Sequence, residues 1–136
     1  MSKGNSGLFT GTSGAGKALI DEVISNGDKI SEDDVLLISK DSSGKIVWLE
    51  KGNSSSGLQH IVDKHGNDFS NIGISEDKIP EFVMTAVTQG TIVGAHGKRN
   101  PRPIYEFEYN GEKYKIAVQV GSNGYIVGAN PRSTKE

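Results

Sequence analysis

Apolar and polar residues alternate along the last third of the chain. Over 103–109 aromatic side chains recur at every second position, and 112–119 repeats the alternation with Tyr, Ile and Val. A period of two is the pattern of strands that bury one face. The Asn-Gly pair at 110–111 is the strongest short hairpin signal. With a short strand at 91–93 and another at 125–129, the sequence predicts an antiparallel meander.

Upstream, the apolar spacing changes to that of helices. The segments that show it are 17–26, 57–65 and 79–89. Three serines that can cap a helix precede the second segment, and Gly66, a typical stop, follows it. Two apolar runs, at 35–39 and 45–50, predict a hairpin. The expected class is therefore α+β, with N-terminal helices packed on a C-terminal antiparallel sheet.

The first sixteen residues are rich in Gly, Ser and Thr, a composition typical of flexible linkers. We therefore expect 1–16 to be a leader and 17–136 to form a single domain. The stretch 11–17 also fits the spacing of a phosphate-binding loop. Ala18 stands where that loop needs a hydroxyl for magnesium, and no strand precedes the loop. A linker is therefore favoured, and no nucleotide cofactor is expected.

Composition excludes several classes of protein. Without cysteine there are no disulfides and no thiolate metal sites, and no apolar run is long enough for a membrane span. The net charge of −2 is uneven, since 1–95 holds eight Lys and Arg against thirteen Asp and Glu, whereas 96–136 holds seven against four. A local basic cleft of this kind can bind phosphate. Ordinary solvated strand faces explain the same charges equally well.

The 57–66 stretch holds two of the three histidines, His60 and His65. A separation of five residues on a continuous helix places them about 140° apart, so they do not chelate one ion and no metal site is expected. Histidine is suited instead to proton transfer near neutral pH. Arginine can supply phosphate contacts beside it. His96, in a Gly-flanked loop, is interpreted as exposed and not catalytic.

The stretch 57–69, GLQHIVDKHGNDF, resembles the GLxHIxxxHG signature of bacterial and phage toxin nuclease domains. The segments 114–120 and 123–131 resemble the closing hairpin of the same domains, which belong to the barnase–EndoU–colicin–RelE-like (BECR) ribonuclease superfamily. The resemblance implies a BECR-like fold and RNase activity without a metal or other cofactor. It also implies tRNA as a frequent substrate and a cognate immunity protein as partner.

The same resemblance implies a location and a set of site residues. Such domains are secreted as part of a larger effector, as in contact-dependent growth inhibition, and act in the cytoplasm of a target bacterium. The expected catalytic residues are His60, His65, Arg99 and Tyr125, and the expected RNA-contacting residues are Lys98, Arg102, Ser122, Asn130, Arg132 and Ser133. Related domains carry a hydroxyl residue and then a Tyr near the last strand, where this chain has Gly128 and Asn130. Ser122, Tyr125 and Ser133 are therefore considered as substitutes.

These observations lead to the hypothesis of a metal-independent endoribonuclease toxin. Attack by the ribose 2′-hydroxyl would leave a 2′,3′-cyclic phosphate and a 5′-hydroxyl, and DNA could not be cut in this way. His60 is assigned as the base and His65 as the acid, with the reverse assignment left open. The rival hypotheses are a non-catalytic RNA- or protein-binding domain of the same fold and a metal-dependent nuclease.

Overall fold

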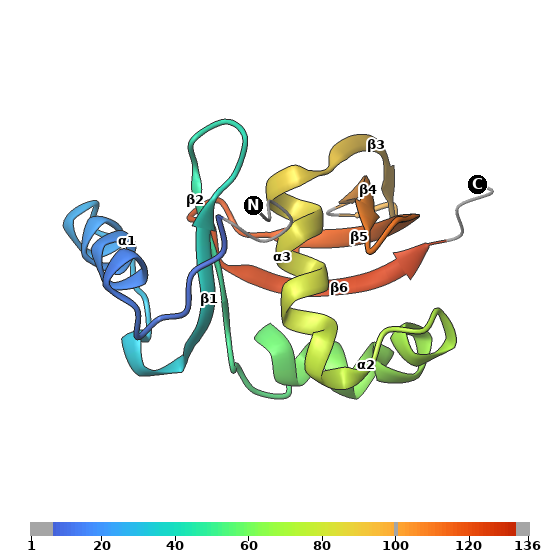
Figure 1. Cartoon of the computed structure of the whole chain (residues 1–136), viewed down its shortest axis with the longest axis horizontal. Helices are drawn as coiled ribbons and strands as arrows, with labels where there is room; N and C mark the ends of the chain where they lie inside the picture. The colour runs from blue at the N-terminus through green and yellow to red at the C-terminus, as the bar shows by residue number, and fades with distance from the viewer. Residues whose placement is uncertain (1–6, 100, 133–136) are drawn as a thin grey trace.

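The computed structural model describes residues 7–99 and 101–132 and has an α+β fold, as predicted (Figure 1). In chain order the elements are α1 (Gly14–Ser25), η1 (Glu32–Asp34), β1 (Val35–Lys40), β2 (Ile46–Glu50), α2 (Gly57–Asn71), η2 (Glu76–Lys78), α3 (Ile79–Gln89), β3 (Thr91–His96), β4 (Arg102–Tyr109), β5 (Glu112–Val120) and β6 (Ile126–Arg132). Within this part of the chain, none of the helices has the length and apolar character needed to cross a membrane.

The last four strands form the predicted antiparallel meander, in the order β3-β4-β5-β6. The β4–β5 turn has positive φ at both central residues, 51° at Asn110 and 84° at Gly111. This is the geometry of the tight hairpin turns whose twist matches that of the strands. The local dipeptide therefore sets the register of β4 against β5, in which Tyr109 pairs with Glu112.

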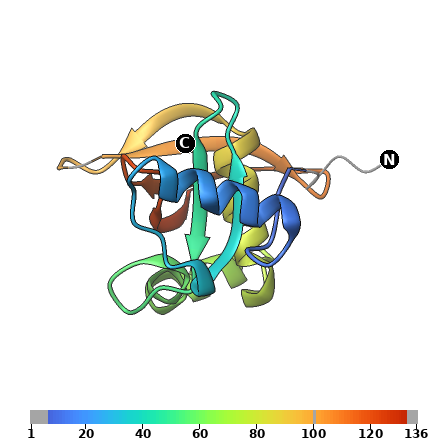
Figure 2. The ribbon, with the colours of Figure 1, turned by 90° about the vertical axis from the view of Figure 1, so that its left-hand side faces the viewer.

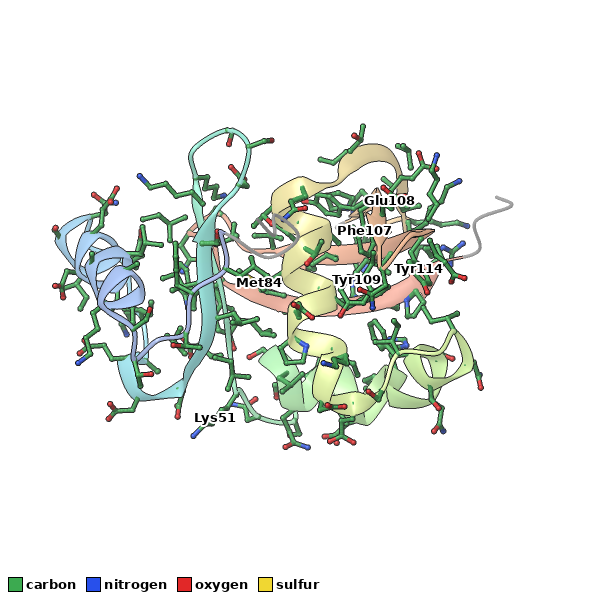
Figure 3. The ribbon with its side chains drawn as sticks, viewed as in Figure 1. Lys51, Met84, Phe107, Glu108, Tyr109 and Tyr114 are labelled. Atoms are coloured by element: carbon green, nitrogen blue, oxygen red, sulfur yellow. The ribbon has the colours of Figure 1, made fainter. Side chains whose placement is uncertain are left out.

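Helix α3 covers one face of this sheet (Figure 1). Its fully buried Phe82 meets Phe107 and Tyr109 edge-on, with ring centroids 4.9 and 5.0 Å apart. Phe107, Tyr109 and Tyr114 gather beside α3 in Figure 3. The Tyr109 hydroxyl donates a 2.7 Å hydrogen bond to Glu81. Burial raises the pKa of Tyr109, and the Glu81 carboxylate raises it further. The phenol therefore stays protonated and joins β4 to α3.

Strand β2 is buried along its whole length because hydrophobic clusters lie on both of its sides. Val47 and Leu49 belong to the main core with α3, whereas Ile46 and Trp48 belong to a second cluster with Ile20 of α1. Figure 2 looks onto α1 where it crosses the β1–β2 hairpin. Helix α1 thus packs on the small sheet. The predicted packing of helices on the C-terminal sheet holds for α2 and α3.

Residues 7–13, which precede α1, are part of the fold, although they were expected to belong to a flexible leader. Phe9 exchanges backbone hydrogen bonds of 3.0 and 2.8 Å with Ile38 of β1. The Ser13 side chain caps α1 by accepting a 2.9 Å hydrogen bond from the Gly16 amide. Gly16 is buried, and a Cβ there would collide with the Thr10 carbonyl. This glycine is therefore required by packing, and α1 begins three residues earlier than predicted. The first six residues lie outside the described part.

Helix α2 is longer than predicted because Gly66 does not end it. Gly66 keeps a helical backbone, and the positive φ typical of a helix stop occurs at Gly73, with φ 86°. Phe69, beyond Gly66, is fully buried and continues the apolar stripe. Strands β3 and β6 also extend further than predicted, to His96 and Arg132. These extensions matter for the site described below.

We predict that Gly66→Ala stabilises the protein by about 0.5–1 kcal/mol, because Gly in a helix interior lowers stability relative to Ala. A Cβ at this position would meet only Val62, at an ordinary 3.6 Å. Urea unfolding followed by the fluorescence of the single Trp48 measures the change. Gly73→Ala is the matched control. Open space surrounds that residue, but its positive φ strains any side chain, so a loss of stability is expected there. Destabilisation by Gly66→Ala would contradict the prediction.

Candidate functional site

An open pocket of about 320 Å³ lies where α2 meets one end of the four-stranded sheet. Its lining comes from α2, the end of β3, the following loop, the start of β4, and β6. The lining residues are His65, His96, Gly97, Arg99, Arg102 and Asn130. Residues separated by up to 65 positions in the chain thus form one polar surface with two imidazoles and two guanidinium groups.

The sheet brings three of these side chains together. His96 at the end of β3 stands directly opposite Arg102 at the start of β4. Arg102 Nη1 reaches past β5 and donates a 3.1 Å hydrogen bond to Asn130 Oδ1 on β6. Successive residues of a strand point to opposite faces. Since Tyr105 and Phe107 are buried in the core with α3, Arg102 lies on the other face of β4.

Gly128 makes room for the Arg102 side chain. It is buried on β6, and a Cβ built there would lie 3.1 Å from Nη2 and 3.4 Å from Nη1 of Arg102. The guanidinium group therefore lies over the backbone of β6, in the space that a side chain would occupy. The hydroxyl residue expected here from the resembling domains would compete with the guanidinium for this space.

Helix α2 presents His65 from the middle of its buried face. Ile61 and Phe69, four residues before and after it, are both fully buried. At 3.6 residues per turn each step of four rotates the side chain by only about 40°. His65 therefore shares the face that packs towards β6, and its side chain is 31% exposed. Its Nδ1 lies 2.9 Å from Oδ2 of Asp68, one turn further along α2.

His60 and Tyr125, both predicted to be catalytic, lie elsewhere. His60 projects from another side of α2, where its Nδ1 donates a 2.9 Å hydrogen bond to the Ser54 carbonyl. The Tyr125 hydroxyl lies 2.7 Å from Oγ of Ser56, and its ring meets Trp48 edge-on. Neither side chain lines the pocket. Tyr125 instead joins the start of β6 to the start of α2.

The other predicted residues divide between the pocket and the surface. Ser122 lines a different pocket, formed with α1 and the β1–β2 turn. Lys98 is exposed in the loop beside Arg99 and is not part of the lining. Arg132 lies on β6 two residues beyond Asn130, opposite Lys115. Ser133 lies outside the described residues. The predicted residues that the structure brings together are His65, Arg99, Arg102 and Asn130.

His96 is the pocket residue that the sequence interpretation rejected. It is exposed, as expected, but it ends β3 instead of lying in a loop. The pairing of β3 with β4 shows how the strand reaches His96. Ile92 pairs with Tyr105, and after a bulge the ladder continues to His96 opposite Arg102. The Gly-Ala sequence before His96 concealed this continuation, because Gly weakens a strand pattern.

The pocket favours anions. Arg99 and Arg102 carry permanent positive charges, and no Asp or Glu of the described residues lines the pocket. Arginine binds phosphate through paired hydrogen bonds, and imidazole can accept or donate a proton near neutral pH. Across residues 7–99 and 101–132, no group of three or more His, Cys, Asp and Glu side chains could hold a metal ion. The arrangement is suited to binding a phosphate and moving protons beside it.

Comparison with known proteins does not add a family to this picture. No protein-family model matches the chain, and no curated protein matches its sequence. The BECR-like resemblance therefore remains a prediction.

We predict that Gly128→Ala displaces the Arg102 guanidinium group from β6 and weakens phosphate binding in the pocket. The displaced group is the end of a flexible side chain, so overall stability should change little. Arginine Nε–H NMR signals and a titration with inorganic phosphate measure the two effects. Gly94→Ala on β3, at the opposite edge of the sheet, is the control, since its Cβ would meet only Ile104, at an ordinary 3.7 Å. Unchanged Arg102 signals in Gly128→Ala would contradict the prediction.

Proposed function

We propose that the chain is a metal-independent endoribonuclease that uses His65 and His96 as its proton-transfer pair. The observation that carries this proposal is the convergence of two imidazoles and two guanidinium groups on one open pocket, to whose lining no carboxylate of residues 7–99 and 101–132 contributes. RNA cleavage by its own 2′-hydroxyl needs a base, an acid and positive charge near the phosphate. The pocket contains a residue for each of these needs.

In the proposed reaction His65 takes the proton from the ribose 2′-hydroxyl. The 2′-oxygen attacks phosphorus, the bond from phosphorus to the 5′-oxygen breaks, and His96 gives its proton to that leaving oxygen. Arg99 and Arg102 stabilise the additional negative charge on the phosphate in the transition state. The products are a 2′,3′-cyclic phosphate and a 5′-hydroxyl. This pairing replaces the expected one, because His60 does not line the pocket.

The biological setting is proposed from the resemblance of the histidine stretch and the closing hairpin to BECR toxin domains. We propose a toxin domain that is secreted within a larger effector, cleaves tRNA in the cytoplasm of a target bacterium, and is neutralised by an immunity protein. The open pocket is compatible with a folded RNA, since the scissile phosphate can enter from the surface.

We predict that His65→Ala and His96→Ala each lower kcat/KM for RNA cleavage by about 10²–10⁴-fold, the usual contribution of a general acid or base. The matched control is His60→Ala, which removes an imidazole from the same helix outside the pocket and should stay close to the wild-type rate. Cleavage of a fluorescent oligoribonucleotide in the presence of a chelator provides the rates. Thermal unfolding of each variant checks that the fold is retained.

Loss of activity in His60→Ala with normal activity in His96→Ala would contradict this assignment. RNA binding without cleavage by any variant, including the wild type, would favour the rival non-catalytic binding domain. Loss of cleavage on addition of chelator would favour the rival metal-dependent nuclease.

The proposed chemistry also predicts the substrate and the product ends. DNA and RNA with 2′-O-methyl groups should both resist cleavage, since each lacks the free 2′-hydroxyl. Cleaved RNA should carry 5′-hydroxyl ends that a polynucleotide kinase labels without prior phosphatase treatment. Mass spectrometry of the fragments identifies the cyclic phosphate. Ends that carry a 5′-phosphate would mean that water is the nucleophile, and the mechanism would then be wrong.

A further inference from the structure

We propose that Asp68 is the positioning residue of His65. Its carboxylate holds the imidazole as the Nδ1–H tautomer, leaves Nε2 available to the pocket, and thereby makes His65 the base. This inference rests on the proposed function and deepens it, because nothing in the pocket lining alone distinguishes the base from the acid.

The geometry of α2 carries the proposal. Nδ1 of His65 and Oδ2 of Asp68 are 2.9 Å apart, at positions i and i+3 of a helix that continues to Asn71. An ionised carboxylate only accepts hydrogen bonds, so Nδ1 carries the proton of this bond. The second ring nitrogen, Nε2, then has its lone pair free to take a proton.

The position of the carboxylate matters as much as its hydrogen bond. The other charged or titratable groups that line the pocket with His65 are His96 from β3, Arg99 from the following loop and Arg102 from β4. None of these groups carries a negative charge, and two of them, Arg99 and Arg102, are permanently cationic. Asp68 supplies a negative charge to His65 from outside the pocket lining.

The two histidines therefore differ in their surroundings. His65 has a carboxylate partner that holds the proton on Nδ1 and leaves Nε2 able to accept one. His96 faces Arg102 across the strand pair, and no hydrogen bond joins it to a carboxylate in the described residues. The environments assign His65 as the base and His96 as the acid.

A purely structural role for the pair must be separated from this one. The side chains of His65 and Asp68 are 31% and 56% exposed, and exposed ion pairs at helical spacing contribute little to stability. Asp63 on the same helix provides a matched control. Its carboxylate accepts a 2.8 Å hydrogen bond from Gln59 and makes no contact with His65. Asp63→Asn removes the same charge from the same helix without touching the pair.

The first experiment reads the tautomer directly and requires no activity. Long-range ¹H–¹⁵N NMR of the wild-type protein, at a pH where the imidazole is neutral, should show His65 mainly as the Nδ1–H tautomer. Asp68→Ala should shift this equilibrium towards the Nε2–H tautomer, the form that free imidazole side chains prefer. His65→Ala assigns the signal, and Asp63→Asn should leave it unchanged. An Nε2–H tautomer in the wild type would overturn the proposal, whether or not the protein cleaves RNA.

The second experiment reads the role of His65 from the pH dependence of kcat/KM. The acidic limb of a bell-shaped profile reports the base and the alkaline limb reports the acid. Asp68→Asn should lower kcat/KM about 10- to 100-fold and alter the acidic limb, because the carboxylate that fixes the tautomer of the base is lost. Movement of the alkaline limb alone, or no difference from Asp63→Asn, would overturn the assignment while leaving the proposed function intact. Absence of cleavage by the wild type would instead overturn the proposed function and, with it, the base assignment.

Discussion

The packing of α2 along β6 is the contact on which the pocket depends. Ile61 and Phe69 are both fully buried, and burial of a side chain of this size contributes about 1.5–3 kcal/mol. Ile61 and Phe69 lie four residues before and four residues after His65. Their burial therefore fixes both the distance of α2 from the sheet and the rotation of the helix about its own axis. A small rotation of α2 would carry the imidazole away from Arg102 and Asn130 and into solvent or into the core.

The two faces of the four-stranded sheet have different surroundings. Aromatic residues on one face pack with Phe82 of α3, and the strands that carry them cannot slip without exposing that core. The opposite face then receives Arg102, in a register set by the same strands. Gly128 and the tight turn at Asn110 show how local backbone freedom serves this arrangement. The turn at Asn110 places β4 and β5 in register, and Gly128 leaves space for the Arg102 guanidinium group.

Much of the fold could be predicted because its signals are local. The boundaries of α3, the β1–β2 hairpin and the turn at 110–111 follow from apolar spacing and turn residues within a few positions. The errors arose where a local signal competed with a distant partner. Gly66 is a typical helix stop, but Phe69 beyond it finds a buried site and the helix continues. Gly16 suggested a linker, but the Thr10 carbonyl lies so close to its Cα that no larger residue fits at this position.

The sequence by itself determined the α+β class, the order of most elements and the residue types available for chemistry near the histidine stretch. Only the tertiary structure decided which residues meet. It placed His65 in the pocket and His60 outside it, and it moved His96 from an apparent loop to the end of a strand opposite Arg102. The physical reason is that the pocket is lined by side chains from a helix and several strands that are distant from one another in the chain. Their register is set by burial of the core on the other side of the sheet.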